Sequence, residues 1–167
     1  MARLPSPSRP FTLGFLIVVV TTRVPEPGGG ASVRQARRTD LVSIDRIEQA
    51  SFPQPWPYSA FESYLGEPGF LVADGPTDGE VVGYVVADTI PNNGTPLGHV
   101  KDIAVADGHR RRGIGTTLLD RSLTVLSETG APTVKLEVRA SNERAISLYE
   151  GFGFEHRRTV PGYYGND

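Results

Sequence analysis

The sequence has 167 residues, a formal net charge of −2 and no cysteine. This length suits one globular domain with a sizeable core. The near-neutral charge gives no electrostatic footprint for nucleic acid, so no nucleic-acid partner is expected. The absence of cysteine excludes a disulfide framework, a cysteine-based zinc site and a cysteinyl covalent intermediate. The three histidines lack metal-ligand spacing, so no metal site is predicted.

Residues 1–32 differ in composition from the rest of the chain. Arg3 and Arg9 precede an apolar run from Phe11 to Val20, and a Pro/Gly-rich stretch follows. The run is shorter than the roughly 20 apolar residues that span a bilayer, so no stable membrane association is expected. The basic start and the short apolar run are marks of a secretory signal, although no small-x-small cleavage site follows directly.

We favour a third interpretation of this segment, in which translation begins at Val20 from a GTG codon. Residues 1–32 are then a leader outside the domain, and the domain runs over residues 33–167. On this interpretation residues 1–19 should be dispensable, and the protein should be cytoplasmic.

From Val33 onward, short strand and helix signals alternate with turn residues. Prolines in the "FPQPWP" stretch separate the first two helices, because proline cannot continue a helix. Thr39 is the expected cap of the first helix. Strands are predicted at 33–36, 70–74, 80–89, 98–106, 133–140 and 154–160, and helices at 39–51, 58–65, 113–128 and 142–150. The order β-α-α-β-β-β-α-β-α-β predicts a mixed α/β sheet.

The stretch "IAVADGHRRRGIGTTLL" places a Gly-x-Gly turn between a strand and a helix. Neither a Rossmann fingerprint nor a P-loop fits its spacing. A helix N-terminus still presents unpaired N–H groups, and the run Arg110–Arg112 adds positive charge, so the turn is suited to hold a pyrophosphate. The alternative is a plain glycine turn beside solvated arginines.

Four motifs in order resemble the GNAT acetyltransferases, and in particular the RimI-like protein N-terminal acetyltransferases. They are "IAVADGHRRRGIGTTLL", "LEVRASNERAISLYEGFGF", the entry loop "SFPQPWPYSAF" and the ending "GYYGND". The resemblance implies a mixed, mostly antiparallel central sheet flanked by helices. The family continues beyond such an ending with one more strand, so the last strand is expected to be missing here.

The resemblance also implies a binding site for acetyl-CoA as co-substrate. The strand before the glycine turn should pair with the pantetheine arm, the turn should hold the pyrophosphate through main-chain N–H groups, and the second motif should complete the site. The implied coenzyme-binding residues are Ile103, Ala104, Val105, Arg110, Arg111, Arg112, Gly113, Ile114, Gly115, Thr116, Asn142 and Tyr149.

Two residues match the catalytic positions of the family. Glu137 matches the proposed general base, which requires a pKa raised by burial. Tyr149 matches the tyrosine at the coenzyme sulfur, where a phenol can protonate the leaving thiolate. Without the resemblance, Glu137 is one of several charged residues on a strand face and Tyr149 is a core aromatic on a helix.

Five residues are the implied contacts of a peptide substrate. Phe52, Pro55 and Trp56 should shape an apolar slot beside the acetyl group, and Tyr163 and Tyr164 match a pair that hydrogen-bonds the first substrate residues. Trp56 is equally well interpreted as a packed anchor of its loop.

The function implied by the resemblance is transfer of an acetyl group from acetyl-CoA to the N-terminal α-amine of proteins in a ternary complex. Ribosomal proteins are among the expected substrates. Two alternatives remain at this point. One is an acetyltransferase for small-molecule amines, and the other is a non-catalytic acyl-CoA-binding subunit.

Overall fold

The strands of the described residues form one sheet of seven, in the order β2-β3-β4-β5-β6-β1-β7. The computed structural model describes residues 16–21, 32–139 and 142–160. Neighbouring strands pair antiparallel except β5 and β6, which are parallel. The strands are β1 (Leu16–Thr21), β2 (Val33–Gln35), β3 (Phe70–Asp74), β4 (Val81–Ile90), β5 (Leu97–Val105), β6 (Thr133–Arg139) and β7 (Glu155–Val160). The predicted mixed, mostly antiparallel sheet is confirmed.

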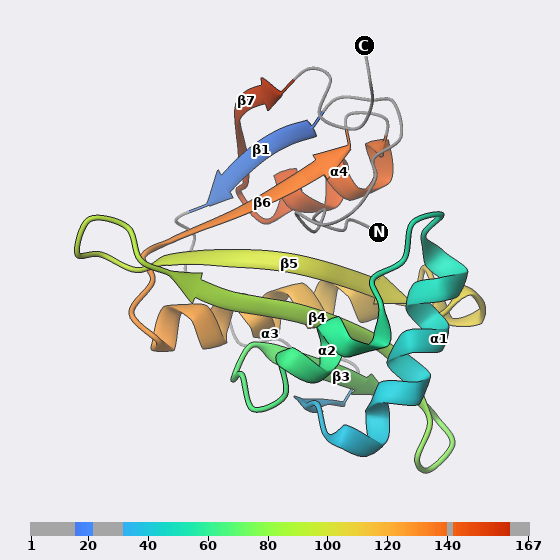
Figure 1. Ribbon diagram of the computed structural model, residues 1–167. Helices are drawn as coiled ribbons and strands as arrows, with labels where there is room; N and C mark the ends of the chain where they lie inside the picture. The colour runs from blue at the N-terminus through green and yellow to red at the C-terminus, as the bar shows by residue number, and fades with distance from the viewer. Residues whose placement is uncertain (1–15, 22–31, 140–141, 161–167) are drawn as a thin grey trace.

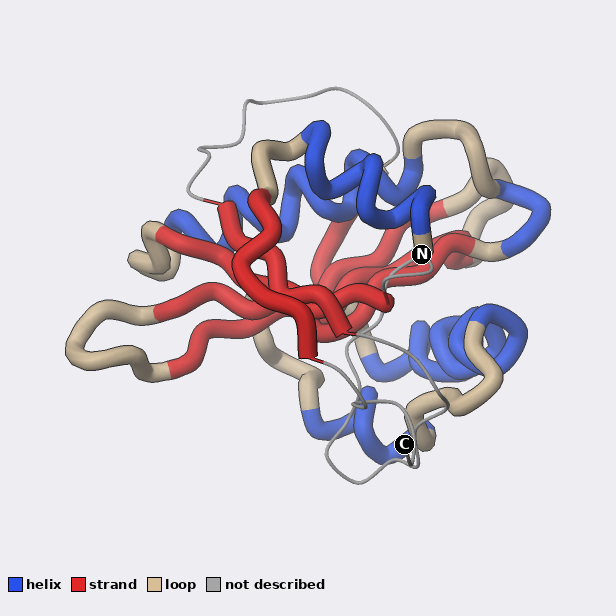
Figure 2. Tube along the Cα trace, turned by 90° about the horizontal axis from the view of Figure 1, so that it is seen from above, coloured by secondary structure: helices blue, strands red, loops and turns tan. Residues whose placement is uncertain are grey.

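Helices cover both faces of this sheet (Figures 1 and 2). They are α1 (Leu41–Ser51), α2 (Tyr58–Ser63), α3 (Ile114–Glu128) and α4 (Glu143–Gly151), with short 3-10 turns at Arg38–Asp40 and Asp107–His109. These bounds confirm the four predicted helices to within about two residues. No helix in the described ranges combines the length and the apolar character needed to cross a membrane.

The core has two layers because successive strand residues point to opposite faces of the sheet. On β5, the side chains of Ile103 and Val105 pack into the same cluster as Leu118 of α3. Ala104, between them in the sequence, packs instead in the cluster that contains Ile44 of α1. The sheet therefore separates a layer formed by α3 and α4 from a layer formed by α1 and α2.

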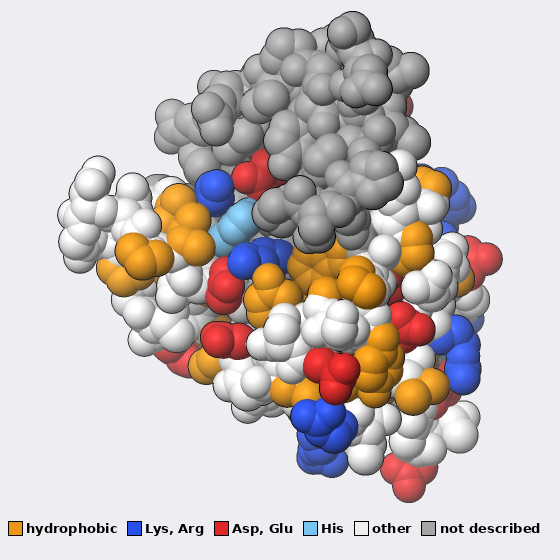
Figure 3. Space-filling view, viewed as in Figure 1, with side chains coloured by type: hydrophobic (Ala, Val, Ile, Leu, Met, Phe, Trp, Pro, Cys, Tyr) orange, Lys and Arg blue, Asp and Glu red, His pale blue; other side chains and the backbone are white. Residues whose placement is uncertain are grey.

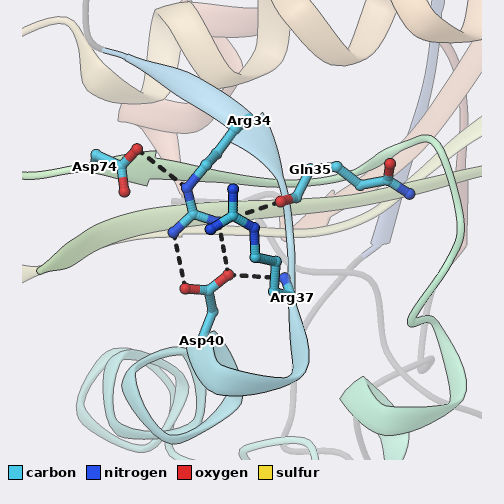
Figure 4. A network of polar contacts seen from close by, with 5 residues as sticks. All are labelled: Arg34, Gln35, Arg37, Asp40 and Asp74. Carbon is cyan, nitrogen blue, oxygen red and sulfur yellow. Dashed lines mark hydrogen bonds and ion pairs between the residues drawn. The ribbon is translucent and has the colours of Figure 1, made fainter. Parts of the chain in front are cut away.

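An ion-pair network fixes the start of α1 against the sheet (Figure 4). Arg34 of β2 donates two hydrogen bonds to Asp40, at 2.8 and 2.9 Å, and a third to Asp74 at 3.2 Å. The backbone N–H of Arg37 donates to Asp40 at 2.7 Å. Asp40, and not the expected Thr39, is the cap residue of α1. A carboxylate is favoured here because it accepts hydrogen bonds from both the backbone and the guanidinium.

The N-terminal part of the chain differs from its prediction. Leu16–Thr21 is a strand inside the sheet, paired with β6 on one side and β7 on the other. The sequence predicted a leader outside the domain over residues 1–32. A run of β-branched residues can add to a strand edge, and the edges that Leu16–Thr21 joins belong to strands more than 100 residues later in the sequence.

Arg34→Met should lower the free energy of unfolding by about 2 kcal/mol, because it leaves the Asp40 carboxylate without its main partner in a buried position. Urea unfolding measures this loss. The matched control is Arg38→Met, which removes an exposed ion pair with Glu62 at 3.0 Å and should cost less than about 1 kcal/mol. Equal losses in both variants would contradict a special role for Arg34.

The cost of Arg34→Met should depend on pH. Burial by itself raises the pKa of Asp40, but hydrogen bonds from Arg34 and from the Arg37 backbone outweigh it and lower that pKa below its ordinary value. A lowered folded-state pKa gives stability that is present above the unfolded value, about 3.9, and is lost as the pH falls through the folded value. The difference between parent and variant should therefore shrink in acid. A difference that stays constant below pH 4 would contradict this.

Candidate active site

The pairing of the sheet is interrupted between β5 and β6, and this interruption is called the opening below. The two strands pair only at Leu97↔Thr133, Gly98↔Val134 and His99↔Lys135. Beyond these pairs the strands diverge (Figure 1), and no pairing joins them elsewhere in the described residues. Within the described residues, β6 therefore does not pair with the stretch of β5 from Ile103 to Val105, and a strand edge of this kind can pair with an extended ligand.

The start of α3 lies directly beyond the end of β5. Gly113 is its cap residue, with φ of 79°, a left-handed conformation that favours glycine. No side chain caps this helix end, and a Cβ built on Gly113 would have no atom within 4 Å. The first N–H groups of α3 are thus left without a side-chain cap just beyond the end of β5, where they can bind an anion.

The three arginines before this helix differ in their contacts. Arg110 donates to the backbone oxygen of Val105 at 3.1 Å, to Asp107 at 3.2 Å and to Ser51 at 3.3 Å. It therefore ties the turn to β5 and to the end of α1. Arg111 and Arg112 are exposed, and Arg111 has a positive φ of 62°. Of the predicted arginines, these two are the ones left exposed beside the helix start.

Glu137 of β6 lies opposite His99 of β5. His99 Nε2 is 2.9 Å from Glu137 Oε2, and Lys135 Nζ is 3.3 Å from Glu137 Oε1. Burial by itself raises the pKa of Glu137, but the hydrogen bond and charge of His99, with Lys135, hold it below its ordinary value. A general base was expected to have a raised pKa, and the structure corrects this expectation, because the alternation of β6 places Lys135 on the same side as Glu137. Glu137 is thus ionised at neutral pH.

Tyr149 of α4 is buried on the other side of the sheet, at 1% exposure. Its ring packs edge to face on Phe154, with centroids 5.7 Å apart. Burial raises the pKa of Tyr149 well above the ordinary value, and the negative charge of Asp102 raises it further. The phenol is therefore held in its protonated form. It is a weaker acid than a phenol in water, because desolvation disfavours the phenolate.

A buried polar network lies under the opening on the α1/α2 side. The Tyr84 hydroxyl on β4 contacts the Glu48 carboxylate on α1, and it also lies 3.3 Å from Asp102 on β5. All three side chains are fully buried. Glu48 also accepts a hydrogen bond of 2.8 Å from the backbone N–H of Trp56. This network ties the loop after α1 to the two central strands.

The entry loop is anchored by Trp56. Its side chain is 4% exposed, and its ring packs on Phe61 and Tyr64 with centroids 5.5 and 5.9 Å away. This geometry agrees with the interpretation of Trp56 as an anchor. Phe52 and Pro55 are half-buried and remain accessible in part.

Lys101 lies two residues after His99 on β5. Lys101 Nζ is 3.2 Å from Asp88 and 3.2 Å from the Tyr64 hydroxyl, and it lies 5.2 Å from the centre of the Tyr64 ring. Burial lowers the pKa of Lys101, but Tyr64 and Asp88 raise it above its ordinary value. On the face shown in Figure 3, basic, acidic and histidine side chains gather beside apolar ones. Lys101 therefore carries a positive charge held in place by Asp88 and Tyr64.

Of the remaining predicted residues, Asn142 lies in the described part of the chain, whereas Tyr163 and Tyr164 do not. The Asn142 side chain accepts a hydrogen bond of 3.2 Å from Ala145 N and so caps α4. Tyr163 and Tyr164 lie outside the described residues, and their predicted contacts stay predictions.

Two residues of β5, His99 and Lys101, were not predicted from the sequence as site residues. The two-residue alternation of "GHVKDIAV" puts both on one face, but only the pairing of β5 with β6 shows that this face meets Glu137.

Comparison with known proteins identifies a family and several relatives that are similar to this chain. Residues 41–154 match the Acetyltransferase (GNAT) family. An N-alpha-acetyltransferase of Sulfurisphaera tokodaii is 39% identical over 146 residues, which covers 80% of this chain and 86% of the relative. The ribosomal protein bS18-alanine N-acetyltransferase of Escherichia coli is 32% identical over 133 residues, which covers 80% of this chain and 86% of that one.

The crystal structure of the ribosomal-protein-S18-alanine N-acetyltransferase from Escherichia coli is also similar to this chain. Its TM-score is 0.69 at 29% identity, and the match covers 81% of this chain and 84% of that chain. Sequence and structure therefore point to the same group of proteins.

Gly115→Asp should weaken the binding of acetyl-CoA at least tenfold, because it places a carboxylate against the expected pyrophosphate in the first turn of α3. Isothermal titration calorimetry measures the affinity. Ser127→Asp is the matched control, since it introduces the same side chain at an exposed position near the other end of α3 and should leave the affinity unchanged. An unchanged affinity in Gly115→Asp would exclude the α3 start as the pyrophosphate site.

Proposed function

This chain belongs to the GNAT acetyltransferase family and is an acetyl-CoA-dependent acetyltransferase, and we propose that its acceptor is the N-terminal α-amine of proteins. The observation that carries this proposal is the contact between His99 and Glu137 at the mouth of the opening between β5 and β6. Relatives at 39% and 32% identity that act on N-terminal amines support it.

The residues of the opening fit the shape and charge of acetyl-CoA. The edge of β5 from Ile103 to Val105, which does not pair with β6, suits the two amide groups of the pantetheine arm, which can pair like an added strand. The uncapped N–H groups of α3, with Arg111 and Arg112 beside them, suit the pyrophosphate. When bound, acetyl-CoA supplies an activated acetyl thioester at the point where β5 and β6 diverge.

Glu137 and His99 remove the proton of the amine. An α-amine has an ordinary pKa of about 8, so most of it is protonated at neutral pH and must lose a proton before it attacks. The Glu137 carboxylate is ionised and can hold the ammonium group by charge. His99 lies within hydrogen-bond distance of it, at 2.9 Å, and an imidazole beside a carboxylate can pass a proton on. We assign the proton transfer to this pair acting together.

Tyr149 is the proposed proton donor to the leaving thiolate. Its burial keeps the phenol protonated in the resting enzyme, which is the form that an acid requires. The raised pKa reduces the driving force for donation, so the proton moves only as negative charge develops on the sulfur. Phe154 fixes the ring from one side, so the hydroxyl has a defined direction.

The finer substrate assignment is a ribosomal protein with a small first residue, modified in the cytoplasm. It rests on the similarity to the bS18-alanine N-acetyltransferase of Escherichia coli. The test is acetyl transfer to peptides beginning with Ala, Ser, Thr, Met-Glu and Met-Leu, with a polyamine and an aminoglycoside for comparison. Preference for peptides supports the proposal, and faster turnover of either small amine would overturn it.

Glu137→Gln should lower kcat for peptide acetylation by roughly 10²–10⁴, the usual contribution of a general base, while acetyl-CoA affinity is retained. Part of the loss should return above pH 9, where the amine is already neutral. Steady-state kinetics from pH 6 to pH 10 measure both effects. Glu128→Gln, at an exposed carboxylate on α3, should behave as the parent. A pH profile identical to that of the parent would remove Glu137 from this role.

Tyr149→Phe should lower kcat by at least tenfold, because a phenyl ring cannot donate a proton to the thiolate. The loss should persist or grow as the pH rises, in contrast to that of Glu137→Gln. The same pH series of kinetics separates the two variants, and thermal unfolding checks that the core is retained. Recovery of the Tyr149→Phe rate at high pH would argue against Tyr149 as the acid.

A further inference from the structure

The strand β1 occupies a position between two strands that come far later in the chain. It pairs antiparallel with β6 over six residues, from Leu16↔Arg139 to Thr21↔Val134, and antiparallel with β7 on its other side. Figure 1 shows β1 between β6 and β7 in the sheet. A segment expected to be dispensable is therefore paired along both of its edges.

The strand β7 depends on β1 for its place in the sheet. Within residues 16–21, 32–139 and 142–160, β7 pairs with β1 and with no other strand. The outer edge of β6 is likewise covered by β1. Without β1, the N–H and C=O groups of two facing strand edges would lose their partners, which is costly for buried backbone.

The sequence of β1 suits an interior strand. Its six residues, Leu-Ile-Val-Val-Val-Thr, include five β-branched ones and no proline, glycine or charged residue. Such a run is typical of strands with neighbours on both sides.

The connection is long enough for β1 to reach this position within one chain. Eleven residues, 22–32, separate β1 from β2, and an extended chain of that length spans about 40 Å. Five interstrand spacings separate β1 from β2 in the sheet, which corresponds to about 24 Å. No second copy of the chain is needed to supply the strand.

We propose that the slot between β6 and β7 is a strand-acceptor site that binds an apolar, β-branched extended segment, and that Leu16–Thr21 fills it in cis. Occupancy of the slot also fixes β6 at the register where Val18 lies opposite Glu137. Any effect of this register on catalysis rests on the role proposed above for Glu137, whereas the strand-acceptor site itself does not depend on that role.

The test uses a chain that lacks residues 1–21, together with a synthetic peptide containing Leu-Ile-Val-Val-Val-Thr flanked by lysines. Hydrogen exchange should be at least tenfold faster in β6 and β7 of the shortened chain than in the parent. Added peptide should restore protection in a saturable manner, and a peptide with proline in place of the first valine should not. Full protection of both strands in the shortened chain would overturn the proposal, as would failure of the first peptide to restore it.

The matched pair in the full chain is Val18→Pro and Val18→Thr. Proline removes a ladder N–H in the middle of β1 and should reproduce the faster exchange of the shortened chain, whereas threonine keeps a β-branched strand residue and should resemble the parent. Equal exchange in the two variants would contradict the proposal. So would a parent that is dimeric by light scattering and exchanges its N-terminal strand between copies, because the strand would then not be supplied in cis.

Discussion

The short pairing between β5 and β6 is the constraint on which the site depends. Three residue pairs join the parallel strands before they diverge. If the ladder continued, the β5 edge would be consumed by β6 and could not receive an extended ligand. The divergence also leaves His99, the last paired residue of β5, beside Glu137 of β6. A single feature of the strand pairing thus provides both the strand edge proposed to bind the coenzyme and the polar pair proposed to transfer the proton.

The charges around this opening are arranged in two layers. On the accessible side, Glu137 is held ionised by His99 and Lys135, whose contacts outweigh the effect of burial on its pKa. Beneath it, Tyr84 joins the buried carboxylates of Glu48 and Asp102. Buried polar groups of this kind are stable only when they are hydrogen-bonded, so the inner layer gives the entry loop and the central strands fixed relative positions.

Much of the fold could be predicted from the sequence because its signals are local. Prolines end the first helix, Gly113 begins α3 and Asn142 caps α4, each within a few residues of its effect. The lowered pKa of Glu137 and the contact with His99 could not be predicted, since they depend on strands about 38 residues apart in the chain. The placement of Leu16–Thr21 was missed for the same reason: it pairs with strands near the opposite end of the sequence.

The most direct measurement is hydrogen exchange of the protein with and without coenzyme A. Coenzyme A should slow the exchange of amides in two places, the part of β5 from Ile103 to Val105, which does not pair with β6, and the first turn of α3. Amides of β3 and of the β3–β4 turn, far from the opening in the sheet order, should be unaffected. Protection absent from the β5 edge, or confined to another surface, would contradict the claim that the divergence of β5 and β6 creates the binding site.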